Sequence, residues 1–206
     1  MVGDYHGAVT DVELLERMLA GDERAFAQLV TRYNSTLIRV ARYYVASDAT
    51  AEDVAQETWV AVLRGAANFE GRSSFKTWLF HILANRARSI GTREHRMIVV
   101  DPTDRSGALA QRFDEGGTWS EPPVPFTDAI DEAMVNERIL RLVREAIARL
   151  PEPHQAVVTL RDVEGLSTKE VSDLLELSEA NVRVILHRGR TRVRADVESS
   201  LQGGGA

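Results

Sequence analysis

Apolar residues recur at intervals of three and four in the first 97 residues, which predicts amphipathic helices. The stretches concerned are residues 22 to 44, 48 to 65 and 73 to 88. Asp22 and Asp48 suit the N-termini of the first two helices, and Gly65 suits the end of the second. Ser73 or Ser74 is placed to cap the third helix. Alternating strand patterns with hairpin turns are missing, so we expect an all-α fold.

Apolar positions within these stretches predict which side chains face the core. In the first helix they are Phe26, Leu29, Val30, Tyr33, Leu37, Val40, Ala41 and Tyr44. In the second they are Ala51, Val54, Ala55, Trp59, Val62 and Leu63. Gly91 interrupts the continuation of the third helix, which is therefore predicted to end early.

Residues 99 to 127 lose this periodicity and mix Gly, Pro, Ser and acids, which predicts an irregular linker. Phe113, Trp119 and Phe126 are unusual in such a segment, and docking onto the neighbouring domains is one explanation for them. Helices resume at about residue 128. The inward stripe of the next helix is predicted to be Ile139, Leu140, Val143, Ile147 and Leu150, with Pro151 ending it.

Two short helices near the C-terminus have the spacing of a helix-turn-helix. After a short helix ending at Gly165, "STKE" at residues 167 to 170 forms a capping box. The helix it opens is followed by a tight turn, and Ser178 caps a last helix that runs to about residue 199. In a helix-turn-helix the second helix enters the major groove of DNA. Pairs of this kind also occur in ordinary helical bundles, so spacing alone leaves both possibilities open.

Side chains on the last helix favour DNA binding. Its inward positions are Val182, Ile185, Leu186 and Val193, and its outward face carries Arg183, His187, Arg190 and Arg194. Near the start of the helix, Glu179, Asn181 and Arg183 are placed to reach base edges, since Arg can pair with guanine and Asn with adenine. The later arginines suit phosphates.

Charge is distributed unevenly along the chain, which has a net charge of −6. Residues 71 to 100 carry a net +5, residues 180 to 195 carry +5, and residues 99 to 133 carry −6. A single arginine-rich face is usually a solvated surface. Two such regions separated by an acidic strip favour contact with a polyanion at two places.

Two polar stripes remain on the N-terminal helices. One consists of Asp53, Gln56, Glu57, Val60 and Arg64, which fall on one side of the second helix. Spacing alone favours a plain solvated surface for this stripe, and a docking face for a protein is the alternative. The other consists of Trp78, His81, Asn85 and Arg88, on one side of the third helix. Either Trp78 belongs to the core, or this row stacks and reads a base, with the loop "FEGRSS" as a pocket for it.

Several motifs, taken in order, resemble a known family. These are "AEDVAQETWVAVLR", "FEGRSSFKTWLFHILAN", "LPEPHQAVVTLRDVEGLSTKEVSDLLELS" and "LHRGRTRVR". They resemble bacterial RNA polymerase sigma factors of the extracytoplasmic-function group in the sigma-70 family, over roughly residues 10 to 97 and 130 to 198. The resemblance implies two small helical domains joined by the irregular acidic linker. The expected limits are a sigma-two-like domain at 10–97, a linker at 98–130, a sigma-four-like helix-turn-helix domain at 131–200 and a disordered tail at 201–206.

The resemblance also implies a role for each surface. The stripe of Asp53, Gln56, Glu57, Val60 and Arg64 would meet the clamp helices of the largest subunit of core RNA polymerase. The second domain would meet the flap of the second-largest subunit. Opening and reading of the minus-ten promoter element would fall to Phe69, Gly71, Arg72, Ser73, Ser74, Lys76, Trp78, His81, Asn85 and Arg88. The minus-thirty-five element would be read by Thr168, Ser178, Glu179, Asn181, Arg183, His187, Arg188 and Arg190.

The sequence departs from the family pattern in its recognition helix. The family usually has Thr-Val-Lys-Ser-Arg, where this chain has Asn181, Val182, Arg183, Val184 and Ile185. The preferred upstream sequence therefore cannot be inferred from the family. The implied partners are core polymerase and promoter DNA, with an anti-sigma factor as a further candidate.

Composition excludes several other functions. The chain has no cysteine, so disulfides and thiolate metal sites are excluded, and its histidines are scattered. No phosphate loop, nucleophile elbow or metal-spaced cluster is found, so we expect neither an enzyme nor a cofactor. Without a secretion signal or a long apolar run, a cytoplasmic location is expected, with no membrane contact. A stand-alone helix-turn-helix repressor is the alternative, although it leaves both N-terminal stripes unexplained.

Overall fold

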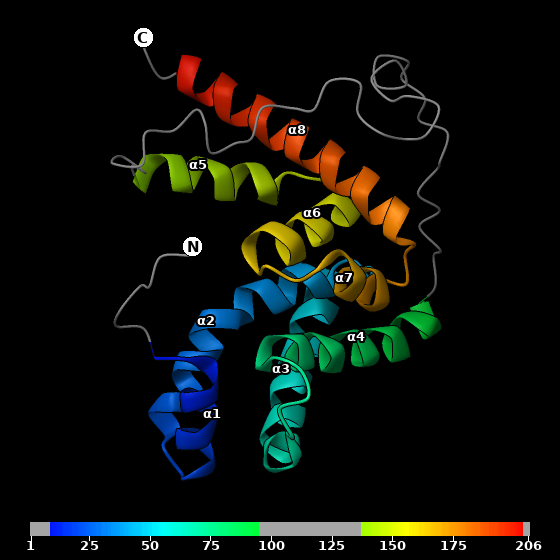
Figure 1. The fold of residues 1–206 in the computed structure, drawn as a ribbon. Helices are drawn as coiled ribbons and strands as arrows, with labels where there is room; N and C mark the ends of the chain where they lie inside the picture. Colours follow the sequence, from blue (N-terminus) through cyan, green and yellow to red (C-terminus); the bar gives the residue numbers. More distant parts are fainter. Residues whose placement is uncertain (1–8, 95–136, 204–206) are drawn as a thin grey trace.

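The computed structural model describes residues 9–94 and 137–203 of the chain. The predicted linker at 98–130 lies outside these ranges, as do Phe113, Trp119 and Phe126. Four α-helices form the N-terminal domain, and a short turn, η1 (Ala66–Asn68), separates the last two. They are α1 (Asp11–Leu19), α2 (Glu23–Ala41), α3 (Asp48–Gly65) and α4 (Phe75–Glu94). In Figure 1, α1 lies beside the lower part of α2, α3 runs downward from near the C-terminal end of α2, and α4 crosses α3.

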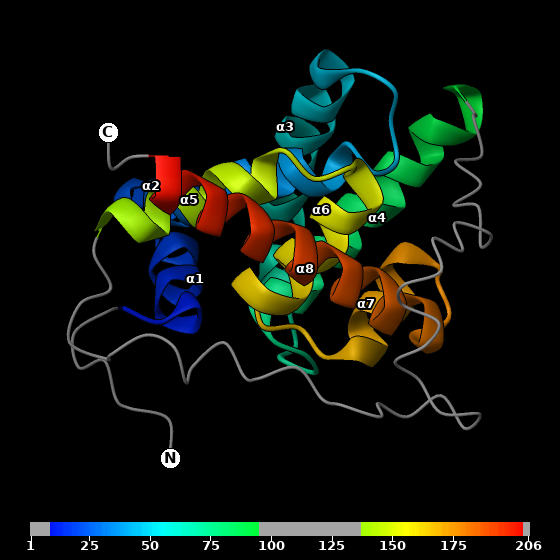
Figure 2. The same cartoon turned by 90° about the horizontal axis from the view of Figure 1, so that it is seen from above.

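The C-terminal domain is built around its longest helix. Its elements are α5 (Glu137–Ala148), α6 (Glu152–Val158), the π-helical turn η4 (Thr159–Val163), α7 (Thr168–Leu175) and α8 (Glu179–Gly203). Helix α8 begins beside α7 and runs across α6 and α5 (Figure 2). The described residues contain no strand. The predicted all-α class with two helical domains is therefore confirmed, and none of the described helices is long and apolar enough to cross a membrane.

Most predicted caps are confirmed. The Asp22 carboxylate accepts bonds from the amides of Arg24 and Ala25, at 2.9 and 3.3 Å. Ser167 and Glu170 form the reciprocal capping box of α7. The prediction for α3 is wrong by one residue. Ser47, rather than Asp48, caps this helix, because its hydroxyl accepts the Thr50 amide at 3.0 Å.

Burial follows the predicted faces except at two leucines. Residues Leu29, Val54, Trp59, Leu79 and Leu83 lie in the core of the N-terminal domain. Leu63 and Leu140, both predicted to face inward, are 52% and 42% exposed. Each leucine lies at the edge of an apolar stripe, where periodicity alone does not separate a buried position from an exposed one.

Gly91 does not end α4, contrary to the prediction. The helix continues to Glu94, and a Cβ at position 91 would lie 2.6 Å from the backbone oxygen of Tyr44. The glycine therefore lets α4 pass close to the end of α2. This close approach explains the residue better than a helix stop does.

The ends of the chain also differ from expectation. Helix α1 was not predicted, although Thr10 and Glu13 form a capping box at its start. Helix α8 runs to Gly203, past the predicted end near residue 199, so residues 201 to 203 are helical instead of belonging to a disordered tail. Residues 204 to 206 lie outside the described ranges.

Candidate nucleic-acid interface

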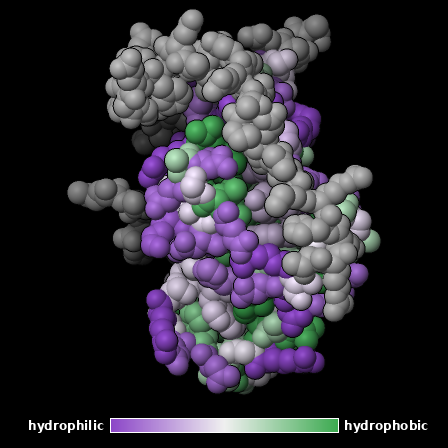
Figure 3. All heavy atoms as spheres, turned by 90° about the vertical axis from the view of Figure 1, so that its right-hand side faces the viewer, coloured by the Kyte–Doolittle hydropathy of each residue, from purple (hydrophilic) through white to green (hydrophobic). Residues whose placement is uncertain are grey.

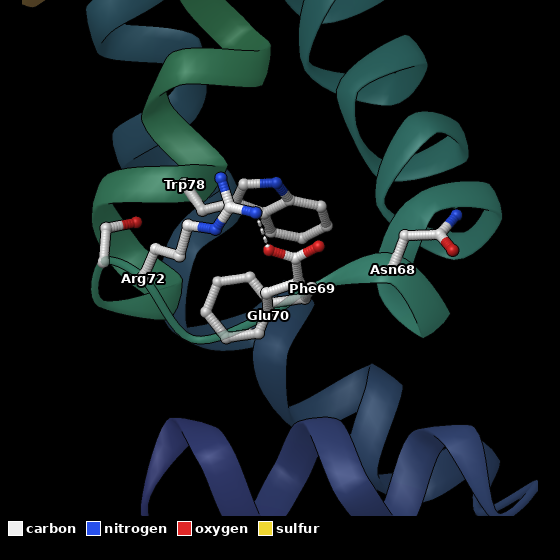
Figure 4. Close-up of a pocket in the computed structure, with 6 residues that line it drawn as sticks. Asn68, Phe69, Glu70, Arg72 and Trp78 are labelled. Carbon is white, nitrogen blue, oxygen red and sulfur yellow. Dashed lines mark ion pairs between the residues drawn. The ribbon is translucent and has the colours of Figure 1, made fainter.

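A shallow pocket lies where η1 leads into α4. Its volume is about 220 Å³, and its lining residues are Asn68, Phe69, Glu70, Arg72, Ser73 and Trp78. The rings of Phe69 and Trp78 form one wall, with centroids 5.1 Å apart and planes tilted by 48°. Figure 4 shows Glu70 and Arg72 reaching towards each other in front of these rings, while Asn68 lies at the opposite side. The predicted loop and the predicted tryptophan are thus brought together in one pocket.

The surroundings of Trp78 fit both possibilities that the sequence left open. Its ring packs against Phe75, with centroids 6.0 Å apart, and against Gly65, whose added Cβ would lie 3.5 Å away. It nevertheless stays partly exposed and lines the pocket. One part of the ring therefore stabilises the domain, and the rest is accessible to a ligand.

The loop before α4 holds its shape through local contacts. Gly71 has a φ of +66°, a backbone conformation that residues other than glycine rarely adopt. Ser74 caps α4, because its hydroxyl accepts the Thr77 amide at 3.0 Å. Ser73 is exposed, and Arg72 forms an ion pair with Glu70. The loop thus presents one cation, already paired with an acid, beside two aromatic rings.

The polar row of α4 is divided between two environments. Asn85 is exposed, as the prediction required. Arg88 instead donates to the Leu174 carbonyl at 3.3 Å and pairs with Glu176 at 3.0 Å, both in the C-terminal domain. The His81 side chain is partly buried and lies close enough to Glu170 to contribute to the lowering of that carboxyl's pKa, after the larger effect of the Ser167 hydrogen bonds.

Lys76 also contacts the C-terminal domain. Its ammonium group donates to the Glu164 carbonyl at 2.6 Å and pairs with the Glu164 carboxylate at 3.3 Å. Neighbouring residues that the sequence did not assign to any functional site do the same. They are Thr36, bonded to Glu164, Thr77, bonded to Glu170, and Tyr43 and Tyr44, bonded to the last carbonyls of α7. Periodicity predicted that Tyr44 faces inward. Periodicity alone does not show that this side chain contacts the other domain.

The helix-turn-helix forms as predicted from α7 and α8. Val182, Ile185, Leu186 and Val193 are all buried, so the opposite face of α8 is directed outward. Thr168 opens α7, and Ser178 caps α8 by accepting the Asn181 amide at 3.1 Å. Near the start of α8, Arg183 is exposed and pairs with Glu179 at 3.0 Å.

Later side chains of α8 have different surroundings. Arg190 donates twice to the Asp162 carboxylate, at 2.9 and 2.6 Å, and this contact raises the pKa of the guanidinium. Arg190 therefore braces α8 against η4 besides lying on the outward face. His187 and Arg188 are half-buried.

On α3, the predicted docking stripe lies at the surface. Its members Asp53, Gln56, Glu57, Val60 and Arg64 are all exposed. Glu57 pairs with Arg86 of α4 at 2.7 Å. Val60 and Leu63 add apolar surface, at 42% and 52% exposure. Figure 3 shows hydrophobic surface within a hydrophilic rim at the lower end of the molecule, where α3 projects downward in Figure 1.

Comparison with known proteins gives the family. The chain is 30% identical over 194 residues to the ECF RNA polymerase sigma-E factors of Salmonella typhimurium and Escherichia coli, covering 94% of this chain and 97% of each relative. The chain belongs to the extracytoplasmic-function sigma factors. It is a transcription initiation factor that directs RNA polymerase to promoters, and the family as such is not catalytic.

Family models match both domains of this sigma factor. Sigma-70 region 2 matches residues 29–96, and sigma-70 region 4 matches residues 140–193. The first match covers both N-terminal stripes that a stand-alone repressor left unexplained, so that alternative is set aside. Among solved structures, that of CnrH in complex with the cytosolic domain of CnrY matches 92% of this chain and 97% of its own, at 24% identity and a TM-score of 0.47.

The departure from the family pattern in the recognition helix has two different structural outcomes. Ile185 is 2% exposed and belongs to the core of the C-terminal domain of this sigma factor. Val184 is 45% exposed, so an apolar side chain stands on the surface of α8 where the family usually has a hydroxyl.

Proposed function

We propose that this sigma factor opens and reads the minus-ten element with the pocket and α4, and reads the minus-thirty-five element with the start of α8. The pocket carries the first half of this proposal, since it joins two aromatic rings to a polar loop at the position that the family resemblance indicates. Its volume of about 220 Å³ is below the roughly 300–1,000 Å³ of ordinary small-molecule sites. A single unstacked base is a suitable occupant, because any base can stack on an aromatic ring.

The second half rests on the outward face of α8. Asn181 and Arg183 stand near the N-terminus of the helix, where a recognition helix contacts base edges. The Arg183 guanidinium is exposed at the surface of α8, where it also pairs with Glu179. Arg183 is thus the residue we expect to discriminate most strongly, by roughly 1–3 kcal/mol for a bidentate contact with guanine.

Docking to core polymerase is assigned to the α3 stripe, with the clamp helices of the largest subunit as its partner. The mixture of Asp53, Gln56 and Arg64 with exposed Val60 gives this face polar and apolar groups, as transient protein interfaces have. The flap of the second-largest subunit would hold the C-terminal domain. These partners place the protein in the cytoplasm, and an anti-sigma factor is a further proposed partner.

Replacing Trp78 tests the minus-ten role. Stacking of one base on an aromatic contributes roughly 1–3 kcal/mol by alanine substitution. At about 1.4 kcal/mol per tenfold, Trp78→Ala should reduce open-complex formation about five- to a hundredfold, while Trp78→Phe should retain most of it. Permanganate footprinting of promoter complexes formed with core polymerase measures the effect.

A melting curve of each variant separates stacking from packing, because Trp78 also contacts Phe75 and Gly65. A Trp78→Ala variant that is folded and opens the promoter at the normal rate would refute the assignment. Arg183→Ala is the matched control, since it should weaken upstream docking and leave opening of a pre-bound promoter unchanged.

A further inference from the structure

Val184 lies at the centre of the outward face of α8. Successive residues of a helix are rotated by about 100°, so the buried Val182, Leu186 and Val193 lie roughly 160 to 200° around the helix from Val184. The Val184 side chain is 45% exposed, whereas that of the next residue, Ile185, is 2% exposed. Val184 therefore points away from the core of the C-terminal domain.

Folding does not account for a valine at this position. Because the side chain is exposed, it adds little to core packing. Valine also has a lower helix propensity than alanine or leucine, since its branched side chain loses freedom against the preceding turn. Single exposed apolar residues are common on proteins, so exposure alone does not indicate a function. The neighbours of Val184 on the helix surface do.

These neighbours are the side chains that the proposed function directs at base edges. Asn181 precedes Val184 by three residues and Arg183 is adjacent to it in the chain. Ala180, which is also exposed, lies one helical turn before Val184. All four residues belong to the first two turns of α8, where a recognition helix contacts bases in the major groove. Valine can form no hydrogen bond to a phosphate, so a base edge is the contact that suits it.

Only one kind of group in the major groove suits an apolar side chain. The other groups on the base edges are hydrogen-bond donors and acceptors, which lose water against a valine without a compensating bond. Thymine alone among the four bases presents a methyl group there, on C5. The side chain of Val184 is β-branched and therefore rigid, and the methyl group of Ala180 lies one turn away. Together they offer this methyl group an apolar surface.

We propose that Val184 is a specificity-determining residue, which selects thymine at one position of the minus-thirty-five element by contact with its C5-methyl group. The proposal rests on the proposed role of α8 in reading this element. It also gives the departure from the family pattern a consequence. A serine hydroxyl at this position can bond to more than one base, whereas Val184 favours the single base that carries a methyl group.

Promoter selection identifies the position concerned. Holoenzyme assembled from the full chain and core polymerase is offered a promoter library with a randomised upstream element. We expect the parent chain to select thymine at one position, and Val184→Ser to accept other bases there while its remaining preferences stay the same. Val12→Ala is the matched control, because Val12 is 52% exposed but lies in the N-terminal domain. It should select the same sequences as the parent.

Replacing the selected thymine by uracil tests the methyl group itself. Uracil keeps every hydrogen-bonding group of thymine and lacks only the C5-methyl group. Burial of one methyl group changes an affinity by about fourfold. Parent and Val12→Ala holoenzymes should therefore bind the uracil promoter about fourfold more weakly than the thymine promoter. Holoenzymes with Val184→Ala or Val184→Ser should bind both promoters equally. Fluorescence anisotropy of labelled promoter fragments measures the ratio, and a melting curve checks that each variant folds.

Equal binding of the two promoters by the parent holoenzyme would overturn the proposal. An effect of uracil that persists in Val184→Ala would do the same, as would a selected element with no thymine that depends on Val184. Failure of the upstream role of α8 gives a different result, because Arg183→Ala would then select the same upstream sequence as the parent. If Arg183→Ala relaxes the selection while the parent binds the uracil promoter normally, α8 reads the element without Val184.

Discussion

Trp78 illustrates why single residues are difficult to assign from sequence. Its spacing fits both a core position and a base-stacking position, and the structure gives it both environments at once. Arg190 presents the same difficulty in reverse. Its place on the arginine-rich face indicated a phosphate contact, while its bidentate pairing with Asp162 gives it a structural role that the sequence did not reveal.

The prediction at the scale of a single residue concerns Gly91. In Gly91→Ala the new methyl group would lie 2.6 Å from the Tyr44 carbonyl oxygen, which is backbone and cannot rotate away. Overpacking of this kind costs about 1–3 kcal/mol, against a gain of about 1 kcal/mol in helix propensity. We expect a net loss of stability in urea denaturation of the full chain. Gln28→Ala, at an exposed position of α2, should change the stability by less than about 0.5 kcal/mol.

A more stable Gly91→Ala variant would show that α4 can shift away from α2. In that case the glycine would be a helix-weakening residue, as the sequence first indicated, and the close approach would have no energetic role.

Helices were largely predictable as elements because each carries its own local signals. The cap at Asp22, the box at Ser167 and the apolar stripe of α8 determined where helices begin and which face they bury. Helix α1 was missed although Thr10 and Glu13 form the same kind of box as Ser167 and Glu170. Local signals did not identify what each exposed face contacts. The Leu174 carbonyl, for example, is a backbone group of a kind that every residue has, so the sequence does not mark it as an acceptor.

The α3 stripe gives the prediction at the scale of an element. Asp53→Ala combined with Gln56→Ala should weaken binding to core polymerase, because both side chains are exposed and are removed from the proposed docking face. Fluorescence anisotropy of labelled protein against core polymerase measures this affinity, and a helical circular dichroism spectrum checks the fold. Glu23→Ala with Gln28→Ala, exposed on α2, is the matched control.

If the stripe variant and its control bind core polymerase with equal affinity, the stripe is an ordinary solvent-exposed surface and not a docking face. Glu57 is left out of the variant because its ion pair with Arg86 joins α3 to α4, so its loss would mix docking with stability.

At the scale of the whole molecule, the sequence predicted two basic regions separated by an acidic one, but not that the two domains touch. Contacts such as that between Thr36 and Glu164 join residues 128 positions apart. No periodic or motif signal connects such distant positions in one sequence. The fold of each domain was therefore predictable, and their mutual arrangement was not.

Residues 99 to 133, with their net charge of −6, give the prediction at this scale. An acidic segment carries charge of the same sign as a nucleic-acid backbone, so we expect this segment to occupy the basic channel of the polymerase. Scrambling its sequence and neutralising its charge at equal length should change core affinity or the yield of abortive RNA. Run-off transcription with the parent and altered chains measures both. The hypothesis fails if neither quantity changes.

The contact of α7 with α4 involves two faces of one polypeptide, so its equilibrium is unimolecular. The fraction of chains in which Glu176 holds Arg88 is then the same at every protein concentration. Dilution, which separates a complex of two different chains, would therefore leave this contact unchanged.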